Sequence, residues 1–328
     1  MKTFIACLLA AAVSAADFDD TDLKFINWMS QHGRIYKSLS EFVERKAVWL
    51  AKHHKIEAHM AKTERNFSMA HNKFSDWTQE EMQVMLGDKS TDESNAYCLP
   101  PPNGHELPTT VPDSVNWVTA GMTTPVKDQG SCGSCWTFAT METVESANAI
   151  AGKGLPVLAE QQLVDCVTAD DGCGGGMTYD AYTYLMTAYA YNEDSWPYTA
   201  TDGTCTYNES DASSVILDTY VCVEPQTPAG MKPAVALKPV AISIDAGSDV
   251  FHNYSGGVLD SDECGISTNH AVAIVGYGTD EASGLEYWLV RNSWGSSWGE
   301  DGFIKIAITE GDGICAINHR PLYPIIKV

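Results

Sequence analysis

A short stretch around position 135 constrains this chain more than any other part of its sequence. Residues 129–136 read Gln-Gly-Ser-Cys-Gly-Ser-Cys-Trp, and residues 137–151 are rich in good helix formers and contain no Pro or Gly. Cys135 is therefore expected in the first turn of a helix, where unpaired N–H groups and the positive end of the dipole surround its sulfur. Such an environment lowers a cysteine pKa from about 8.5 and favours the thiolate.

The spacing of Cys132 and Cys135 also allows two other interpretations. A Cys-x-x-Cys pair is typical of thiol–disulfide oxidoreductases and of half a zinc site. Residues 1–15 combine a basic Lys2, an apolar run and small residues at their end, which is the layout of a signal peptide. Ten cysteines in an exported chain favour disulfides over a reduced metal cluster. We therefore expect no metal and no cofactor.

Composition and charge limit which class of protein this chain can be and which partners it can have. With 328 residues, 44% hydrophobic and 19% charged, the chain has the make-up of a globular protein with a large core. Beyond the signal peptide, no stretch is apolar for long enough to span a bilayer. Residues 1–107 hold 12 basic and 15 acidic side chains, whereas residues 108–328 hold 8 basic and 28 acidic ones. This acidity argues against nucleic acid or anionic lipid as a partner.

The signal-peptide layout predicts entry into the secretory pathway, with an acidic lysosome-like or vacuole-like compartment or the extracellular space as destination. In that context three Asn-x-Ser tripeptides become candidate glycosylation sites, at Asn66, Asn208 and Asn253.

The rest of the chain divides into an N-terminal helical part, a linker, a helical half and a β half. Residues 19–59 carry apolar residues at helical spacing and predict a helical hairpin. Residues 87–107 lack periodicity, contain three consecutive prolines and predict an exposed linker, the kind of segment that proteases cut. The later patterns predict helices at 137–151, 160–164 and 179–191, and strands at 240–244, 272–278, 287–290 and 303–308.

A cysteine that attacks a carbonyl needs a base, and the base needs a group that orients it. His270 opens one of the predicted strands and is the candidate base. Asn292 is the candidate orienter, because its side-chain carbonyl can accept an N–H from the imidazole. Gln129 lies six residues before Cys135, and its amide together with the backbone N–H of Cys135 could hold an oxyanion.

Together these motifs resemble those of the papain-like cysteine proteases. That family carries Cys-Gly-Ser-Cys-Trp around its nucleophile, with the histidine about 130–150 residues downstream. His270 follows Cys135 by 135 residues, and Asn292 follows it by 157. The run from Asn292, Asn-Ser-Trp-Gly-Ser-Ser-Trp-Gly, also matches the family, in which Trp294 would cover the hydrogen bond between imidazole and amide.

The N-terminal part resembles the propeptides of cathepsin L-like members. The spacing Glu-x3-Arg-x2-Val-Trp-x6-Ile from Glu41 follows the interspersed ERFNIN pattern, with Lys52 and Met60 where the pattern has asparagine. Residues 70–76, Ala-His-Asn-Lys-Phe-Ser-Asp, resemble the second propeptide motif. Residues 111–117 resemble the start of the mature enzymes, so we place the processing boundary near Leu107.

The resemblance implies an α+β fold, the papain-like two-lobe fold, preceded by a helical propeptide. The implied divisions are a signal peptide at 1–15, an inhibitory propeptide at 16–107 with its linker at 87–107, and a mature peptidase domain at 108–328, with a helical lobe at about 118–214 and a β-barrel-like lobe at about 215–328 plus the N-terminal strand. A cysteine endopeptidase made as an autoinhibited zymogen would follow, with a Cys135 thiolate and His270 imidazolium pair and a thioester intermediate. Its partners would be peptide and protein substrates, its own propeptide and cystatin-like inhibitors, and it would act as a monomer.

The resemblance also implies a disulfide framework. The implied pairs are Cys132–Cys173, Cys166–Cys205 and Cys264–Cys315. The pairing of Cys98 and Cys222 remains open: they form a bridge that tethers the linker to the β half, or Cys222 is a buried free thiol and Cys98 is removed with the linker.

Substrate recognition is implied for a further set of residues: Gly175, Gly176, Met177, Thr178, Ser243, Thr268, Asn269, Trp294 and Arg320. The two glycines would form a bare wall along which a substrate backbone pairs as an added strand. Arg320 would lie at the floor of the pocket, where a buried guanidinium must be paired or solvated. It either confers a preference for polar or acidic side chains or extends into water.

Two other functions stay open at this point. A catalytically silent homologue could serve as a storage or binding protein, although Gln129, Cys135, His270 and Asn292 are all retained. A thiol–disulfide oxidoreductase would require Cys132 and Cys135 to pair with each other.

Overall fold

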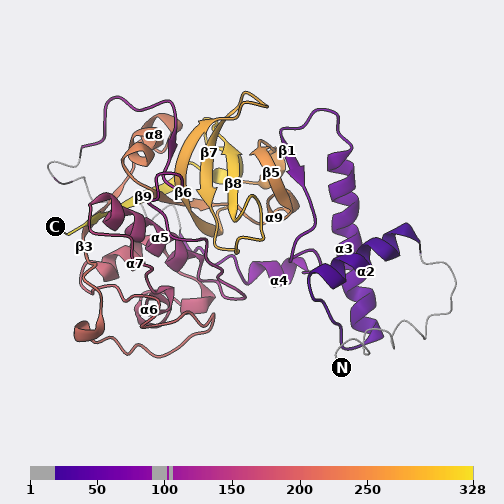
Figure 1. Ribbon diagram of the computed structural model, residues 1–328, viewed down its shortest axis with the longest axis horizontal. Helices are drawn as coiled ribbons and strands as arrows, with labels where there is room; N and C mark the ends of the chain where they lie inside the picture. The colour runs from indigo at the N-terminus through magenta and orange to yellow at the C-terminus, as the bar shows by residue number, and fades with distance from the viewer. Residues whose placement is uncertain (1–18, 91–101, 103–105, 328) are drawn as a thin grey trace.

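The structure is a computed structural model that describes residues 19–90, 102 and 106–327 (Figure 1). The expected signal peptide at 1–15 and Cys98 lie outside the described residues. The N-terminal segment, residues 19–90, contains α2 (Asp20–Gln31), α3 (Leu39–Met60), β1 (Phe67–Met69) and α4 (Gln79–Gln83). Within the described residues, no helix is long and apolar enough to span a membrane.

Helices α2 and α3 form the helical hairpin that the sequence predicted. Asp19 caps α2 through a reciprocal pair of hydrogen bonds with Asp22, and Ser38 caps α3. Between the helices, an aromatic cluster closes a small core of its own: Phe25, Trp28, Tyr36 and Trp49. In Figure 1 this hairpin stands beside β5 and α9, and α4 leads back to the remainder of the molecule.

The helical half of the remaining chain contains α5 (Cys135–Ile150), α6 (Glu160–Cys166) and α7 (Thr178–Leu185), with short 3₁₀ turns at Gly172–Gly174 and Glu209–Asp211. Nearly every side chain of α5 is buried. The prediction of a helix over 179–191 was wrong at its end, because α7 stops at Leu185. After a turn at residues 186–188 the chain pairs with neighbouring segments: Ala190 N–H donates to Val215 O, and Tyr191 O accepts from Ala159 N–H. Pairing with neighbouring segments overrides helix propensity there.

The β half forms one sheet with the order β1-β5-β8-β7-β6-β4-β9-β3, with β2 paired to β6. Its strands are β2 (Val115–Asn116), β3 (Leu217–Cys222), β4 (Val240–Ile244), β5 (Tyr254–Leu259), β6 (His270–Thr279), β7 (Glu286–Arg291), β8 (Phe303–Ala307) and β9 (His319–Ile326). The helices here are α8 (Pro228–Leu237), which the strand patterns did not predict, and α9 (Asp249–His252), with 3₁₀ turns at Asp262–Cys264 and Ile314–Ala316. β5 and β8 run parallel, and the other pairs are antiparallel.

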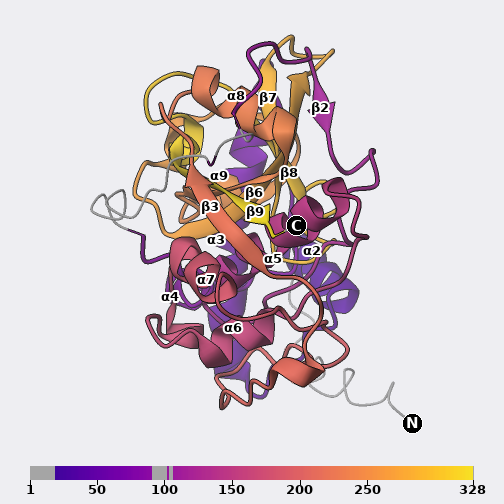
Figure 2. The same ribbon diagram turned by 90° about the vertical axis from the view of Figure 1, so that its left-hand side faces the viewer.

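The two halves pack against each other through α5. Side chains of α5 share one hydrophobic cluster with Ala241 of β4, Ala271 of β6 and Leu322 of β9. Figures 1 and 2 show the helices α5 to α7 gathered on one side of these strands. The packing brings the first residue of α5, Cys135, to the first residues of β6. The papain-like two-lobe arrangement that the resemblance implied is therefore present.

The N-terminal segment joins the second half by strand pairing and by aromatic contact. β1 extends the sheet at β5, with Phe67 opposite Gly257. The Phe74 ring meets the Trp294 ring edge-on, with centroids 5.5 Å apart. The prediction of an exposed linker from residue 87 was wrong at its start, because Gly87 and Asp88 are buried. Their backbone groups pair with the body of the protein, which an independent linker would not do.

Candidate active site

Cys135 begins α5 and is fully buried. Its sulfur accepts a hydrogen bond from the Ala271 N–H, with 3.5 Å between nitrogen and sulfur. Because Ala271 follows His270 on β6, this contact places the sulfur beside the backbone of the candidate base. Cys135 is the one free cysteine among those that the structure describes.

His270 and Asn292 form the hydrogen bond expected of a base and its orienter. Nε2 of His270 lies 2.8 Å from Oδ1 of Asn292, and the same oxygen accepts the Ser293 N–H at 2.8 Å. An amide oxygen only accepts, so Nε2 carries the proton and a neutral imidazole presents a lone pair at Nδ1. Within the described residues, Nδ1 has no hydrogen-bond partner. The Trp294 ring lies 5.0 Å from the imidazole and shields the pair from water.

The side-chain amide of Gln129 accepts a hydrogen bond at its oxygen and donates two from its nitrogen. Its Oε1 accepts from Ser293 Oγ at 2.7 Å. Its Nε2 donates to Cys132 O at 2.8 Å and to Met85 O at 2.9 Å. Met85 belongs to the N-terminal segment, so a main-chain carbonyl of that segment occupies the donor predicted for an oxyanion. Sequence reasoning missed Ser293, although it follows Asn292 directly in a motif already singled out.

The N-terminal segment runs as an extended chain through the cleft between the helical half and the β half, with Gly176 on one wall and Asn269 on the other. Gly176 N–H donates to Gly87 O at 2.9 Å, and Gly176 O accepts from Lys89 N–H at 3.0 Å. On the opposite wall, Asn269 O accepts from Asp88 N–H at 3.1 Å. Gly175 has a φ of +116°, and a Cβ there would lie 2.5 Å from Gly87 O. In this structure the wall at Gly175 and Gly176 thus lies along the backbone of the N-terminal segment, and its pairing with a substrate stays a prediction.

Burial decides the protonation state of the site in this covered form. Burial, and to a lesser extent the Asp88 carboxylate, raises the pKa of the Cys135 thiol to about 12, although N–H groups of Ala271, Gly87 and Trp136 oppose the rise. Burial lowers the pKa of the His270 imidazole to about 4, against the opposing effect of the Asn292 bond. The lowered cysteine pKa expected from the helix start is not present in this covered form. Both groups are neutral, because the cleft excludes the water that would solvate the charged pair.

The remaining residues predicted for substrate recognition lie on both walls. Thr178 begins α7, and Ser243 lies on β4 opposite His319. Arg320 is partly buried, and its Nη1 donates to Thr268 Oγ1 at 2.8 Å. Its backbone has a φ of +52°, an unfavourable conformation for a side-chain-bearing residue. The guanidinium is thus directed to Thr268, which immediately precedes Asn269 in the cleft wall.

The cysteines separate the competing interpretations of the Cys-x-x-Cys spacing. Disulfides join Cys132 to Cys173, Cys166 to Cys205 and Cys264 to Cys315. Because Cys132 pairs with Cys173, it does not form a redox pair with Cys135. Cys222 is also disulfide-bonded, which contradicts the alternative of a buried free thiol. Cys98 lies outside the described residues, so its pairing with Cys222 stays a prediction.

The candidate glycosylation sites differ in accessibility. Asn66 and Asn208 are exposed. Asn253 is 1% exposed, and its side-chain amide donates to Asp249 O at 3.0 Å. A glycan on Asn253 is incompatible with this packing, so that prediction was wrong.

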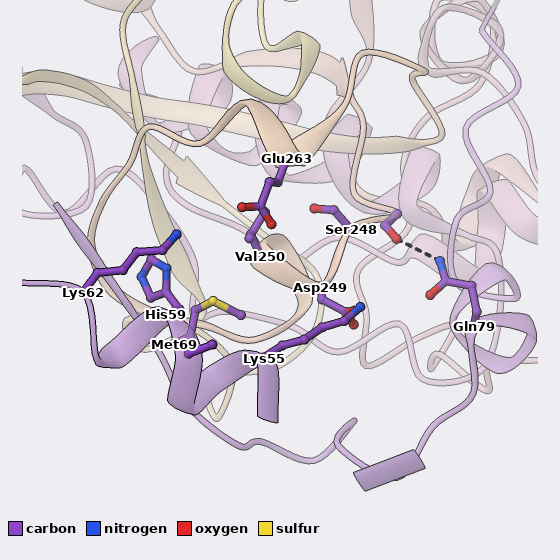
Figure 3. A pocket seen from close by; sticks show the side chains of 11 residues that line it. Lys55, His59, Lys62, Met69, Gln79, Ser248, Asp249, Val250 and Glu263 are labelled. Carbon is purple, nitrogen blue, oxygen red and sulfur yellow. Dashed lines mark hydrogen bonds and ion pairs between the residues drawn. The ribbon is translucent and has the colours of Figure 1, made fainter. Parts of the chain in front are cut away.

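A cavity of about 460 Å³ lies away from the cleft, where α3 and α4 meet α9 (Figure 3). Figure 3 shows Lys55 directed toward Asp249 and the Gln79 amide directed toward the chain at Ser248. The lining residues are Lys55, Ala58, His59, Lys62, Met69, Gln79, Gly247, Ser248, Asp249, Val250 and Glu263. None of them was predicted to act in catalysis. Among the described residues, no cluster of His, Cys, Asp and Glu could hold a metal ion.

Comparisons with known proteins agree with this geometry. Residues 111–325 match the family model described as papain family cysteine protease, and residues 25–82 match the cathepsin propeptide inhibitor domain. Fruit bromelain of Ananas comosus is 36% identical over 98% of this chain and 92% of its own. Vignain of Ricinus communis is 37% identical over 100% of this chain and 96% of its own.

Solved structures of precursors are similar along nearly the whole chain. The digestive procathepsin L2 proteinase from Tenebrio molitor larval midgut has a TM-score of 0.86 and 34% identity, and the match covers 93% of this chain and 99% of that one. A recombinant stem bromelain precursor has a TM-score of 0.83 and 32% identity, with 94% and 100% covered.

Proposed function

Since this chain belongs to the papain family of cysteine proteases and carries the cathepsin propeptide inhibitor domain, we propose that Cys135, His270, Asn292 and Gln129 are its catalytic residues. The chain is a cysteine endopeptidase made as a zymogen, and the N-terminal segment is the intramolecular inhibitor. The observation that carries the residue assignment is the hydrogen-bond chain from His270 through Asn292 and Ser293 to Gln129, beside the Cys135 sulfur.

The reaction begins when the N-terminal segment leaves the cleft. Water then reaches the site, and the Cys135 proton moves to Nδ1 of His270, which forms a thiolate and an imidazolium. The thiolate attacks the substrate carbonyl carbon, and the resulting oxyanion lies between Gln129 Nε2 and the Cys135 N–H. His270 gives its proton to the leaving amine, and a thioester remains. A water molecule that loses a proton to His270 then hydrolyses the thioester, while Asn292 holds the imidazole in one tautomer.

Labelling with an epoxide thiol-protease inhibitor tests the assignment. The acid-matured enzyme should take up one equivalent, on Cys135, and lose all peptidase activity. The Cys135→Ser enzyme should take up none. Label on another cysteine, or activity that survives in Cys135→Ser, would refute the assignment. Full labelling without peptidase activity on any peptide would favour the storage or binding homologue.

Processing and location follow from the same proposal. The signal peptide would be removed after residue 15, and cleavage near Leu107 would leave residues 108–328 as the mature enzyme. The chain would enter the secretory pathway and mature in an acidic lysosome-like or vacuole-like compartment or outside the cell. It would act as a monomer and bind cystatin-like inhibitors in the same cleft. N-terminal sequencing of the matured enzyme tests the boundary, and a start far from residue 108 would refute it.

We also propose that Arg320 gives the pocket a preference for polar or acidic side chains. Its contact with Thr268 Oγ1 supports this choice over a side chain that extends into water. A positional-scanning peptide library should show that Arg320→Ala reduces cleavage of peptides with Glu or Asp in the pocket position. An unchanged profile would refute the preference without affecting the catalytic assignment.

A further inference from the structure

A tyrosine outside every catalytic motif connects the two parts of the proposed oxyanion hole. The Tyr198 hydroxyl donates to the Gln129 backbone carbonyl at 2.8 Å and lies 2.6 Å from Ser134 Oγ. Gln129 supplies one oxyanion donor, and Ser134 immediately precedes Cys135, whose N–H supplies the other. Tyr198 itself comes from the loop between α7 and β3.

The direction of these hydrogen bonds follows from the groups involved. The Gln129 carbonyl has no proton, so it must accept the single proton of the Tyr198 hydroxyl. Ser134 therefore donates its proton to the Tyr198 oxygen. The result is a directed chain from the Ser134 hydroxyl through Tyr198 to the Gln129 backbone, in which each proton has one assigned acceptor.

Ser134 gives up its usual local role to make this contact. It is the N-cap residue of α5, a position where a serine hydroxyl ordinarily accepts a hydrogen bond from a backbone N–H in the first helical turn. Here its side chain makes no such cap. The hydroxyl is used instead for a contact with a residue 64 positions away. The helix therefore lacks a stabilising side-chain cap at its start, and the tertiary contact with Tyr198 offsets that loss.

Tyr198 is itself held in place from two sides. Its ring packs edge-on against Phe138 of α5, with centroids 4.9 Å apart, and its N–H donates to Glu193 Oε1 at 2.8 Å. Burial raises the pKa of the phenol above its ordinary value, so the hydroxyl keeps its proton at any working pH. By contrast, Gly130, directly after Gln129, has a φ of +59° and no side chain to fix the loop.

We propose that Tyr198 is a positioning residue that fixes the spacing between the Gln129 and Cys135 donors. The proposal rests on the oxyanion hole assigned above. An oxyanion hole works because its donors are already in place when charge develops on the carbonyl oxygen. A donor that has to reorganise during the reaction contributes less, so loss of the Tyr198 hydroxyl should slow the chemical step and leave substrate binding unchanged.

The test is Tyr198→Phe in the acid-matured enzyme, because phenylalanine keeps the packing on Phe138. We expect kcat/KM to fall about tenfold, through kcat, which is less than the roughly 10²–10³-fold loss for an oxyanion donor itself. Affinity for a peptide aldehyde should fall by the same factor, since its hemithioacetal oxygen occupies the hole. Alkylation of Cys135 by iodoacetamide forms no oxyanion, so its rate and pH profile should stay unchanged.

Two further variants make the test specific. Tyr184→Phe is the matched control, since its hydroxyl contacts Gln162 in the same half of the protein, 3.3 Å away, and its loss should change neither kinetic constant. Ser134→Ala added to Tyr198→Phe should cost little more than Tyr198→Phe alone, because both act through one chain.

Three outcomes would overturn the proposal. Unchanged kcat and aldehyde affinity in Tyr198→Phe would show that the hydroxyl positions nothing. A parallel fall in the iodoacetamide rate would show general damage to the site. Full activity in Gln129→Ala would refute the oxyanion hole itself. That result is distinguishable from a failure of the Tyr198 proposal alone, because it changes the proposed donor and not the tyrosine.

Discussion

The substitution Gly87→Ala should open the zymogen without disturbing either of its parts. Gly87 lies so close to Gly133 that an added Cβ would be 1.8 Å from the Gly133 carbonyl oxygen. That atom is backbone and cannot turn away, so the extended chain in the cleft must move. The φ of Gly87 lies outside the left-handed region, and alanine can adopt its conformation in the free segment.

The displacement removes three main-chain hydrogen bonds across the cleft. They join Gly87 and Lys89 to Gly176, and Asp88 to Asn269, at 2.9, 3.0 and 3.1 Å. At a net value of about 0.5–1.5 kcal/mol each, their loss weakens the closed state by about 1.5–4.5 kcal/mol. The population of the open zymogen should therefore rise by about 10–10³-fold.

Alkylation of Cys135 measures that population. With a thiol pKa of about 12, the closed zymogen is almost entirely unreactive at neutral pH, so labelling proceeds through the open state. Iodoacetamide labelling of the intact zymogen at neutral pH, read by peptide mass, should be faster in Gly87→Ala by the factor above. Val84→Ala, an exposed side chain on the same segment, is the control. Equal labelling rates for wild type and Gly87→Ala would refute the view that this chain seals the site.

Three other predictions concern pH, the buried charges and the cysteines. His71 is flanked by His53, Lys52 and His32, and burial with these basic neighbours lowers its pKa to about 3, below the unfolded value of about 6.5. Its contribution to stability is therefore intact above about pH 6.5 and is lost as the pH falls toward 3. Because the imidazole is partly exposed, about 1–2 kcal/mol of the free energy of unfolding should be lost by about pH 4.5. Urea unfolding of the Cys135→Ser zymogen should show this loss, His71→Gln should reduce it, and an equal loss in both would contradict the assignment. Arg291 of β7 forms an ion pair with Glu142 of α5 in the interior. Arg291→Met should lower the free energy of unfolding by about 3–5 kcal/mol, because it leaves the Glu142 carboxylate without its partner, and adding Glu142→Gln should recover part of that loss. A neutral effect of Arg291→Met would show that water reaches the pair. For Cys98 and Cys222, alkylation of the processed enzyme without reduction should label Cys135 alone, and additional labelled thiols would rule out the bridge.

The chemical identity of the site was readable from the sequence because it resides in local motifs. Residues 129–136 fix a cysteine at a helix start, and the run from Asn292 carries both the orienting amide and the tryptophan that covers it. The helical hairpin, the helix at α5 and strand β4 also follow from local periodicity and capping. The end of α7 and the course of residues 87–89 do not, because contacts with distant segments decide them.

The tertiary structure alone decided the protonation state of the site and the distant residues that hold its groups in place. The helix start predicts a reactive thiolate at Cys135, yet the thiol pKa is raised, because burial in the packed chain, together with the charge of Asp88, outweighs the local dipole. The same kind of long-range contact buries Asn253 and brings Tyr198 to Gln129. A sequence motif specifies which groups react, whereas burial and hydrogen bonding, which depend on the whole packed chain, determine whether those groups are charged and how they are held.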